Sequence, residues 1–180
     1  MKSAKRFLAA LALTGATAAA SAAPIHVTWD GFVSGSRSGT ITGPDTNASG
    51  SPVSRSVRAG QFAFDVTSGA YWDEQLRAFC IDVTETLVTP AATYHLVAGE
   101  DSALLGDAQL AGIGWLFDNV SDQLGTRTND AAFQLAVWEL MYDTDPLSLV
   151  QAAGGAFWST GFNGAREVAN GWLADLTLAT

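Results

Sequence analysis

The hydrophobic pattern changes its period part-way along the chain, and this change constrains the fold more than any other feature. Between Ile25 and Ala98 apolar residues alternate in short runs, which is typical of strands separated by turns. From Ser102 to Leu176 they recur at spacings of three and four, which is typical of helices. Strands first and helices afterwards, without βαβ alternation, predict an α+β fold: an antiparallel β-sheet or small sandwich followed by a helical part packed on it.

The first half of the chain predicts four strands, at residues 25–33, 61–67, 76–83 and 93–98. Residues 76–83 are apolar on both faces near their middle, as in an interior strand. Residues 34–60 are rich in Gly, Ser, Thr and Pro, with a strand-like stretch at 38–42. We expect a flexible loop or a mobile hairpin there.

The second half predicts three helices, at residues 102–120, 130–142 and 165–176. Ser102 is the expected N-cap of the first helix, and Thr128 or Asn129 that of the second. The second helix should end before Asp143, because Pro146 cannot extend it.

The first 23 residues resemble a secretory signal peptide. A basic start precedes a short apolar run and small residues suited to cleavage: Lys2, Lys5, Arg6, then Phe7 to Leu13, then Ala20-Ser21-Ala22. Thr14, Gly15 and Thr17 interrupt the run, which makes a permanent membrane span improbable. We expect a secreted or cell-surface protein with one mature module at residues 24–180. A buried N-terminal helix is the alternative.

Charge narrows the classes of partner. The chain has 18 acidic and 9 basic residues, a net charge of −9, and three of the basic residues lie in the expected signal. Such a surface disfavours nucleic acid and anionic membranes as partners. The 48% hydrophobic content is enough for the core of a single domain.

Cys80 is the single cysteine of the chain, so it cannot form an intramolecular disulfide. In an exported protein, an odd cysteine is a buried inert thiol, a partner in an intermolecular disulfide, or a reactive thiol. Its neighbours Phe79 and Ile81 predict burial.

Gln134 is the polar exception in a helix that is apolar around nearly its whole circumference, with Glu139 near its end. A buried carboxamide without partners costs about 1–3 kcal/mol, so a partner is expected. Gln134 and Cys80 can meet where helix and sheet pack. Attack of a thiolate on the amide carbon, with loss of ammonia, would give an internal thioester, provided that water is excluded and a donor faces the oxyanion.

Two short motifs carry a family resemblance. Phe79-Cys80-Ile81-Asp82 resembles the aromatic-Cys-hydrophobic signature of bacterial thioester domains, and Phe133-Gln134-Leu135-Ala136-Val137-Trp138 resembles their hydrophobic-Gln-x-x-hydrophobic-Trp signature. The resemblance covers residues 62–176. It implies an adhesion module without cofactor or metal that is not a turnover enzyme and that attaches covalently to amine or hydroxyl groups of a surface or matrix target. Cys80 would be the thioester sulfur and Gln134 the acyl donor, with Phe79, Asp82, Trp138 and Glu139 in support.

The wider setting also resembles a known group of proteins. The short signal, the alanine-rich composition and the Gln-x-x-x-Trp-Glu segment are similar to exported proteins of Gram-negative bacteria in which such segments precede a Pro-Glu-Pro sorting tail. Residues 176–180 show no such tail. We expect a freely secreted protein or a truncated sequence.

Other functions stay open at this point. A non-covalent structural or interaction domain would hold Cys80 reduced and Gln134 satisfied by other partners. A cysteine hydrolase would pair Cys80 with His95 or His26. Asp143 and Asp145 supply fewer oxygen ligands than calcium needs, so a helix-terminating turn is the better interpretation. Core packing is likewise favoured over a carbohydrate platform for four tryptophans: Trp115, Trp138, Trp158 and Trp172.

Overall fold

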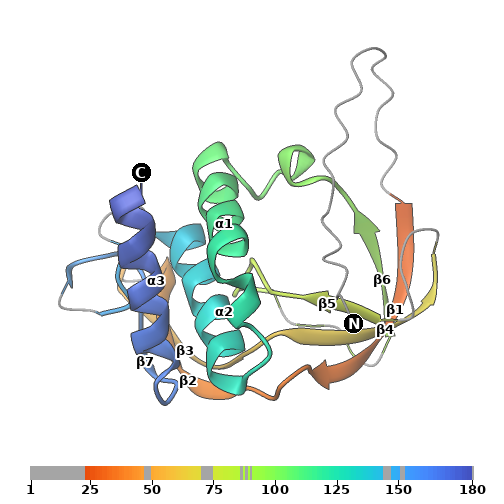
Figure 1. Cartoon of the computed structure of the whole chain (residues 1–180), viewed down its shortest axis with the longest axis horizontal. Coiled ribbons are helices and arrows are strands. Elements are labelled where there is room, and N and C mark those ends of the chain that lie inside the picture. Colours follow the sequence, from red (N-terminus) through yellow and green to blue (C-terminus); the bar gives the residue numbers. More distant parts are fainter. Residues whose placement is uncertain are drawn as a thin grey trace, which may run out of the picture.

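The computed structural model of the chain describes residues 23–46, 50–69, 75–85, 87, 89, 91–143, 147–150 and 153–179. In this part of the chain, two antiparallel sheets and three α-helices confirm the predicted α+β fold (Figure 1). The expected signal peptide, residues 1–23, lies outside the described residues apart from Ala23. None of the described helices is both long enough and apolar enough to cross a membrane.

The strands form a four-stranded and a three-stranded sheet. The first has the order β5-β4-β1-β6, with β1 at Ala23–Phe32, β4 at Phe62–Ser68, β5 at Gln75–Ala78 and β6 at Ala91–Leu96. The second has the order β3-β2-β7, with β2 at Arg37–Thr46, β3 at Pro52–Ala59 and β7 at Trp158–Gly161. Strand β7 was not predicted, because it is only four residues long and lies in a Gly-rich segment.

A bent two-stranded ribbon joins the sheets. The β1–β4 pairing ends at Phe32 and Phe62, and the β2–β3 pairing begins at Arg37 and Ala59. Between them the Val33 N–H donates to the Gln61 carbonyl over 2.9 Å. For residues 34–60 we expected a flexible loop or a mobile hairpin. Strands β2 and β3 occupy most of this range and pair as a hairpin, so the expectation of a loop is corrected. Pairing of β2 on both sides, with β3 and with β7, outweighs the turn-forming composition.

Strand β5 is shorter than predicted and lies at an edge of its sheet. We expected an interior strand over 76–83, but β5 ends at Ala78. Phe62, the first residue of β4, pairs with Ala78, so the residues that follow have no strand to pair with. Cys80 therefore lies just beyond the strand that was predicted to hold it.

The helices follow the predicted pattern: α1 and α2 start at other residues than predicted, and α3 starts where predicted but ends later. They are α1 at Asp107–Val120, α2 at Arg127–Tyr142 and α3 at Ala165–Ala179, with 3-10 turns at Gly99–Asp101 and Ser121–Gln123.

The predicted helix caps were wrong. Ser102 accepts a hydrogen bond from the nearby Leu104 N–H, and α1 begins after Gly106. Thr126 caps α2 by accepting from the Asn129 N–H over 3.1 Å. Thr128, one of the expected caps, instead accepts a hydrogen bond from the guanidinium of Arg37 on β2. Its side chain is therefore engaged with the sheet and does not cap the helix.

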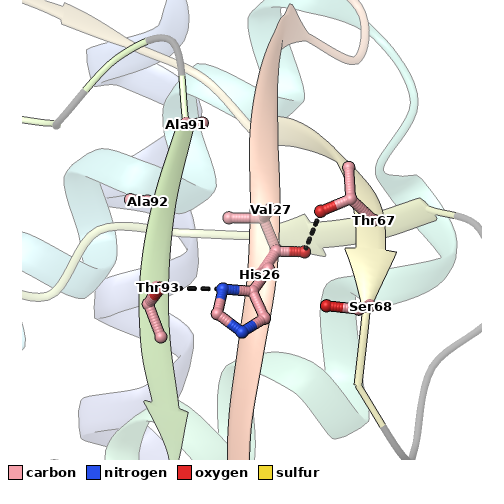
Figure 2. Close-up of a pocket in the computed structure, with 7 residues that line it drawn as sticks. All are labelled: His26, Val27, Thr67, Ser68, Ala91, Ala92 and Thr93. Atoms are coloured by element: carbon pink, nitrogen blue, oxygen red, sulfur yellow. Dashed lines mark hydrogen bonds between the residues drawn. The ribbon is translucent and has the colours of Figure 1, made fainter.

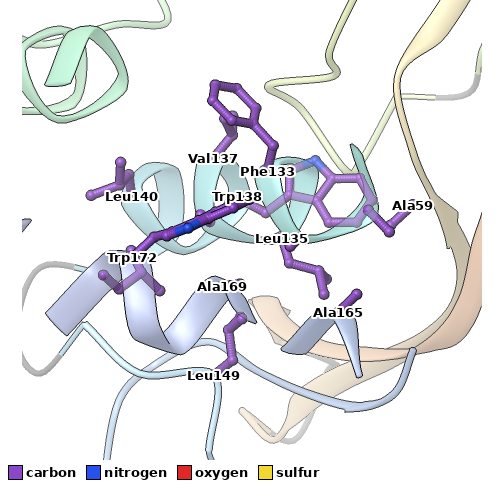
Figure 3. Packing of buried hydrophobic residues seen from close by; sticks show 14 of the residues in the cluster. Ala59, Phe133, Leu135, Val137, Trp138, Leu140, Leu149, Ala165, Ala169 and Trp172 are labelled. Carbon is purple, nitrogen blue, oxygen red and sulfur yellow. The ribbon is translucent and has the colours of Figure 1, made fainter. Parts of the chain in front are cut away.

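Helix α2 is the centre of the main core. It contacts α1, α3, β2 and β3, and every residue from Asp130 to Leu140 is buried, as its sequence predicted. Figure 3 shows its apolar side chains packed against those of α3, with Trp138 and Trp172 in the same cluster. A smaller core of Ile25, Val27 and Phe64 belongs to the four-stranded sheet.

The bend in the ribbon depends on Gly60. A Cβ there would lie 2.8 Å from the Gly35 carbonyl oxygen and 2.9 Å from the Phe32 ring. We expect Gly60→Ala to lower the free energy of unfolding by about 1–3 kcal/mol, because backbone or ring must shift. Gly171→Ala on α3 has open space around its Cβ and should raise stability by up to about 1 kcal/mol. Urea unfolding of both variants measures the difference, and an unchanged midpoint for Gly60→Ala would contradict this account of the bend.

Candidate functional site

A groove of about 540 Å³ lies where the two cores meet. Apolar side chains of β1, β4 and β5 line one side, and Arg58 of β3 lies on its wall. Trp138 of α2 and residues 79–83 complete it, Cys80 among them. The groove therefore gives a molecule outside the core access to Cys80, the residue predicted to be reactive.

Gln134 and Cys80 are in direct contact. The Cys80 N–H donates to Gln134 Oε1 over 2.8 Å, and Gln134 Nε2 donates to the Cys80 carbonyl oxygen over 2.7 Å. The carboxamide is 1% exposed. Beyond the end of β5 it bonds the backbone N–H and C=O of Cys80, as a neighbouring strand would do. Both buried groups obtain the partners that they need.

The Cys80 sulfur lies in a protected, half-buried position. Its Sγ donates to the carbonyl oxygen of Asp82 over 3.0 Å. Burial raises the pKa of the thiol above its ordinary value, and the nearby Asp82 charge raises it further. The hydrogen bond to Asp82 and the approach of the Trp138 side chain lower that pKa, but by less. The resting thiol is therefore neutral.

One face of α2 holds the segment that contains Cys80. Gln134, Trp138 and Tyr142 follow one another at intervals of four residues and so lie on one side of the helix. The Tyr142 hydroxyl accepts from the Val83 N–H over 3.0 Å and lies 3.1 Å from Asp82 Oδ1. Burial raises the pKa of Tyr142 to about 12. Tyr142 was not among the predicted site residues, although its position two helical turns after Gln134 on the same face was a usable signal.

Asp82 shapes the turn after the cysteine. Its Oδ1 accepts from both the N–H and the hydroxyl of Thr84, over 2.8 and 2.7 Å, and these bonds hold its pKa below the ordinary value. The carboxylate is thus engaged with the turn, while the backbone carbonyl of the same residue faces the thiol.

Phe79 anchors the other end of the segment. Its ring lies 4.5 Å from that of Phe133, centroid to centroid, and Phe133 in turn lies 4.9 Å from Phe117. Phe133 immediately precedes Gln134, so this contact fixes the segment and the helix against each other.

Glu139 belongs to a different environment from the other predicted site residues. It is fully buried, and its Oε1 accepts from the Ser148 N–H over 2.7 Å. Burial raises the pKa of Glu139 to about 8, and the Asp143 charge contributes.

Asp143 accepts from the Phe157 N–H, consistent with a turn that ends the helix. Asp145, the other residue of the calcium site that we weighed, lies outside the described residues.

Neither histidine is among the residues that line the groove with Cys80 in the described part of the chain. His26 lies in a separate, open pocket on β1, β4 and β6, where its Nδ1 is 2.8 Å from Thr93 Oγ1 (Figure 2). Thr67 and Ser68 line the same pocket, and Thr67 donates to the His26 carbonyl (Figure 2). The residues described thus offer no histidine base beside the thiol, as a cysteine hydrolase would need.

Comparison with known proteins gives no relative to place beside this geometry. No family model matches the chain, and neither a curated protein nor a solved structure does. Function is therefore argued from the site itself.

The buried Glu139 predicts a specific dependence of stability on pH. Its folded pKa, about 8, lies above the ordinary 4.5, so the folded state holds a proton that the unfolded state loses as pH rises. The free energy of unfolding should then fall between pH 4.5 and 8, by up to about 1.4 kcal/mol per pH unit from this group. Glu139→Gln keeps an acceptor for Ser148 and should remove this contribution.

The measurement is chemical unfolding of wild type and Glu139→Gln at a series of pH values. Glu100→Gln, which removes an exposed carboxylate, is the control for the loss of one charge. Parallel stability curves for wild type and Glu139→Gln would contradict the assignment of a protonated, buried Glu139.

Proposed function

We propose that the protein is a secreted or surface-associated module that forms an internal thioester between Cys80 and Gln134 and uses it to attach covalently to a nucleophile on a target surface. The observation that carries this proposal is the pair of hydrogen bonds between the Gln134 carboxamide and the backbone of Cys80. These bonds hold the amide carbon beside the residue whose sulfur would attack it. Proximity of this kind accounts for much of the rate of intramolecular acyl transfer.

The geometry supports attack in two ways. Negative charge would develop on Gln134 Oε1, where the Cys80 N–H already donates over 2.8 Å, so an oxyanion donor is in place. A residue whose N–H and C=O bond on the same side is extended, and its side chain stands out of the plane of those bonds. We therefore expect the attacking sulfur to approach from above the plane of the carboxamide, the side from which a nucleophile adds.

The reaction balances without a co-reactant. The sulfur forms a bond to Gln134 Cδ, the bond from Cδ to Nε2 breaks, and ammonia leaves carrying the thiol proton. In the second reaction, an amine or hydroxyl of the target bonds to Cδ and the bond from Cδ to the sulfur breaks. The proton of the nucleophile passes to Cys80, which is released as a free thiol. The bond is consumed in attachment, so the module acts once.

The groove supports access by a target. It reaches Cys80 from the four-stranded sheet, and its walls are mostly apolar with Arg58, Asp82 and Glu85 as charged members. Such walls limit competing hydrolysis by water while admitting a nucleophile carried on a side chain or sugar. The expected targets are proteins or polysaccharides of a surface or matrix.

The alternative is a non-covalent structural or interaction domain. The observation that favours it is that both polar atoms of the carboxamide bond backbone groups and that the thiol donates to the Asp82 carbonyl oxygen. In that case the same two residues only fasten the segment after β5 to the helix.

Intact-mass measurement separates the two functions. We expect the purified protein to be lighter than its sequence by one ammonia and to gain a methylamine adduct, located at Gln134, when incubated with methylamine. Cys80→Ala should show the full sequence mass and no adduct. Gln109→Glu, which alters a half-buried glutamine of α1, should behave as wild type.

A full sequence mass for the wild type, together with ready alkylation of Cys80 under native conditions, would reject the thioester. An adduct that persists in Cys80→Ala would also reject it, because the acyl group would then not come from a bond to that sulfur.

A further inference from the structure

Trp138 carries a buried hydrogen-bond donor, its indole N–H, that is not paired in the described part of the chain. Its side chain is only 4% exposed, yet its indole N–H has no hydrogen-bond acceptor among the described residues. Buried donors are rarely left without a partner, since each one costs free energy of folding. An unpaired donor of this kind beside a reactive group suggests a partner that appears during the reaction.

The position of Trp138 identifies that partner. It lies one helical turn after Gln134 and lines the groove together with Cys80. Its indole lies close enough to the Cys80 sulfur to lower the pKa of the thiol by acting as a donor, although the N–H makes no full hydrogen bond to the neutral thiol. The indole N–H is therefore a donor near the sulfur, and it has no other acceptor among the described residues.

The other groups near the sulfur do not suit an anion. The Asp82 carbonyl accepts a hydrogen bond from the thiol, the Asp82 carboxylate is negative, and the Tyr142 hydroxyl donates to that carboxylate. Glu85 also lines the groove, and Arg58 lies against the Phe32 ring with its guanidinium carbon 4.8 Å from the ring centroid. A thiolate at this site needs a neutral donor that is already in place.

We infer that the indole N–H of Trp138 is the donor that stabilises the Cys80 sulfur while it is anionic, as the attacking thiolate when the thioester forms and as the leaving group when it opens. This role rests on the proposed thioester. When the thioester forms, the sulfur gives up its proton, which leaves with ammonia. When the bond opens, the sulfur takes a proton from the attacking amine or hydroxyl, and in both steps the indole nitrogen keeps its own. The donor thus acts on the reacting atom without taking part in proton transfer.

Trp138→Phe tests the assignment, because it keeps an aromatic ring in the core and removes the N–H group together with the five-membered ring that carries it. Trp172→Phe makes the same change in the same core from α3 and is the matched control. The free thiol is obtained by opening the wild type with methylamine, or directly wherever no thioester has formed. Its pKa is read from the rate of alkylation by iodoacetamide as a function of pH.

We expect Trp138→Phe to raise the thiol pKa by about one unit, so that alkylation at neutral pH slows by about tenfold. Methylamine should also open any thioester of this variant about tenfold more slowly. Trp172→Phe should match the wild type in both rates.

The inference is overturned if Trp138→Phe leaves the thiol pKa unchanged, or if Trp172→Phe raises it equally. A melting temperature for each variant shows whether the fold is retained. If the wild type forms no thioester, its mass equals the full sequence mass. The thioester is thus tested by mass, and the role of Trp138 by the pKa of the thiol.

Discussion

The pairing of the Gln134 carboxamide with the Cys80 backbone is the interaction on which the site depends. The partner strand β4 begins at Phe62, opposite Ala78, so the chain beyond Ala78 must find other partners for its N–H and C=O groups. A side chain from the most buried helix supplies them over 2.8 and 2.7 Å. The same contact satisfies the one neutral amide side chain that α2 buries and brings a carboxamide to a thiol.

The rest of the fold places this contact at a boundary between two cores. The chain bends at Gly60, and residues of the four-stranded sheet and of the helical core line a common groove. Helix α2 is buried along most of its length, which makes its Gln134–Trp138–Tyr142 face a rigid support. Groups held in this way lose little further freedom in a reaction, which favours chemistry between them. Burial also keeps the resting thiol neutral, so that a donor to the anion becomes necessary.

Much of this arrangement could be predicted from hydrophobic period alone. The change from alternation to helical spacing gave the fold class, and the all-round apolar character of residues 131–142 placed Gln134 in the core. Strand ends and caps could not be predicted, because they depend on partners distant in sequence. Strand β5 ends where its partner strand begins, at Phe62, and Thr128 bonds Arg37 and does not cap its helix. The composition of residues 34–60 left a loop and a hairpin both open, and pairing of β2 with β3 and β7 decided for the hairpin. Glu139 was grouped with the site by motif alone, although its side chain accepts from the Ser148 N–H.

A high-resolution crystal structure of the purified protein tests the central claim most directly. The account predicts continuous electron density from Cys80 Sγ to Gln134 Cδ, no nitrogen at Nε2, and an acyl oxygen still bonded to the Cys80 N–H. Separate density for an intact carboxamide and for a thiol directed at the Asp82 carbonyl, in crystals of freshly purified protein, would contradict it. In that case the contact between Cys80 and Gln134 would serve the fold alone.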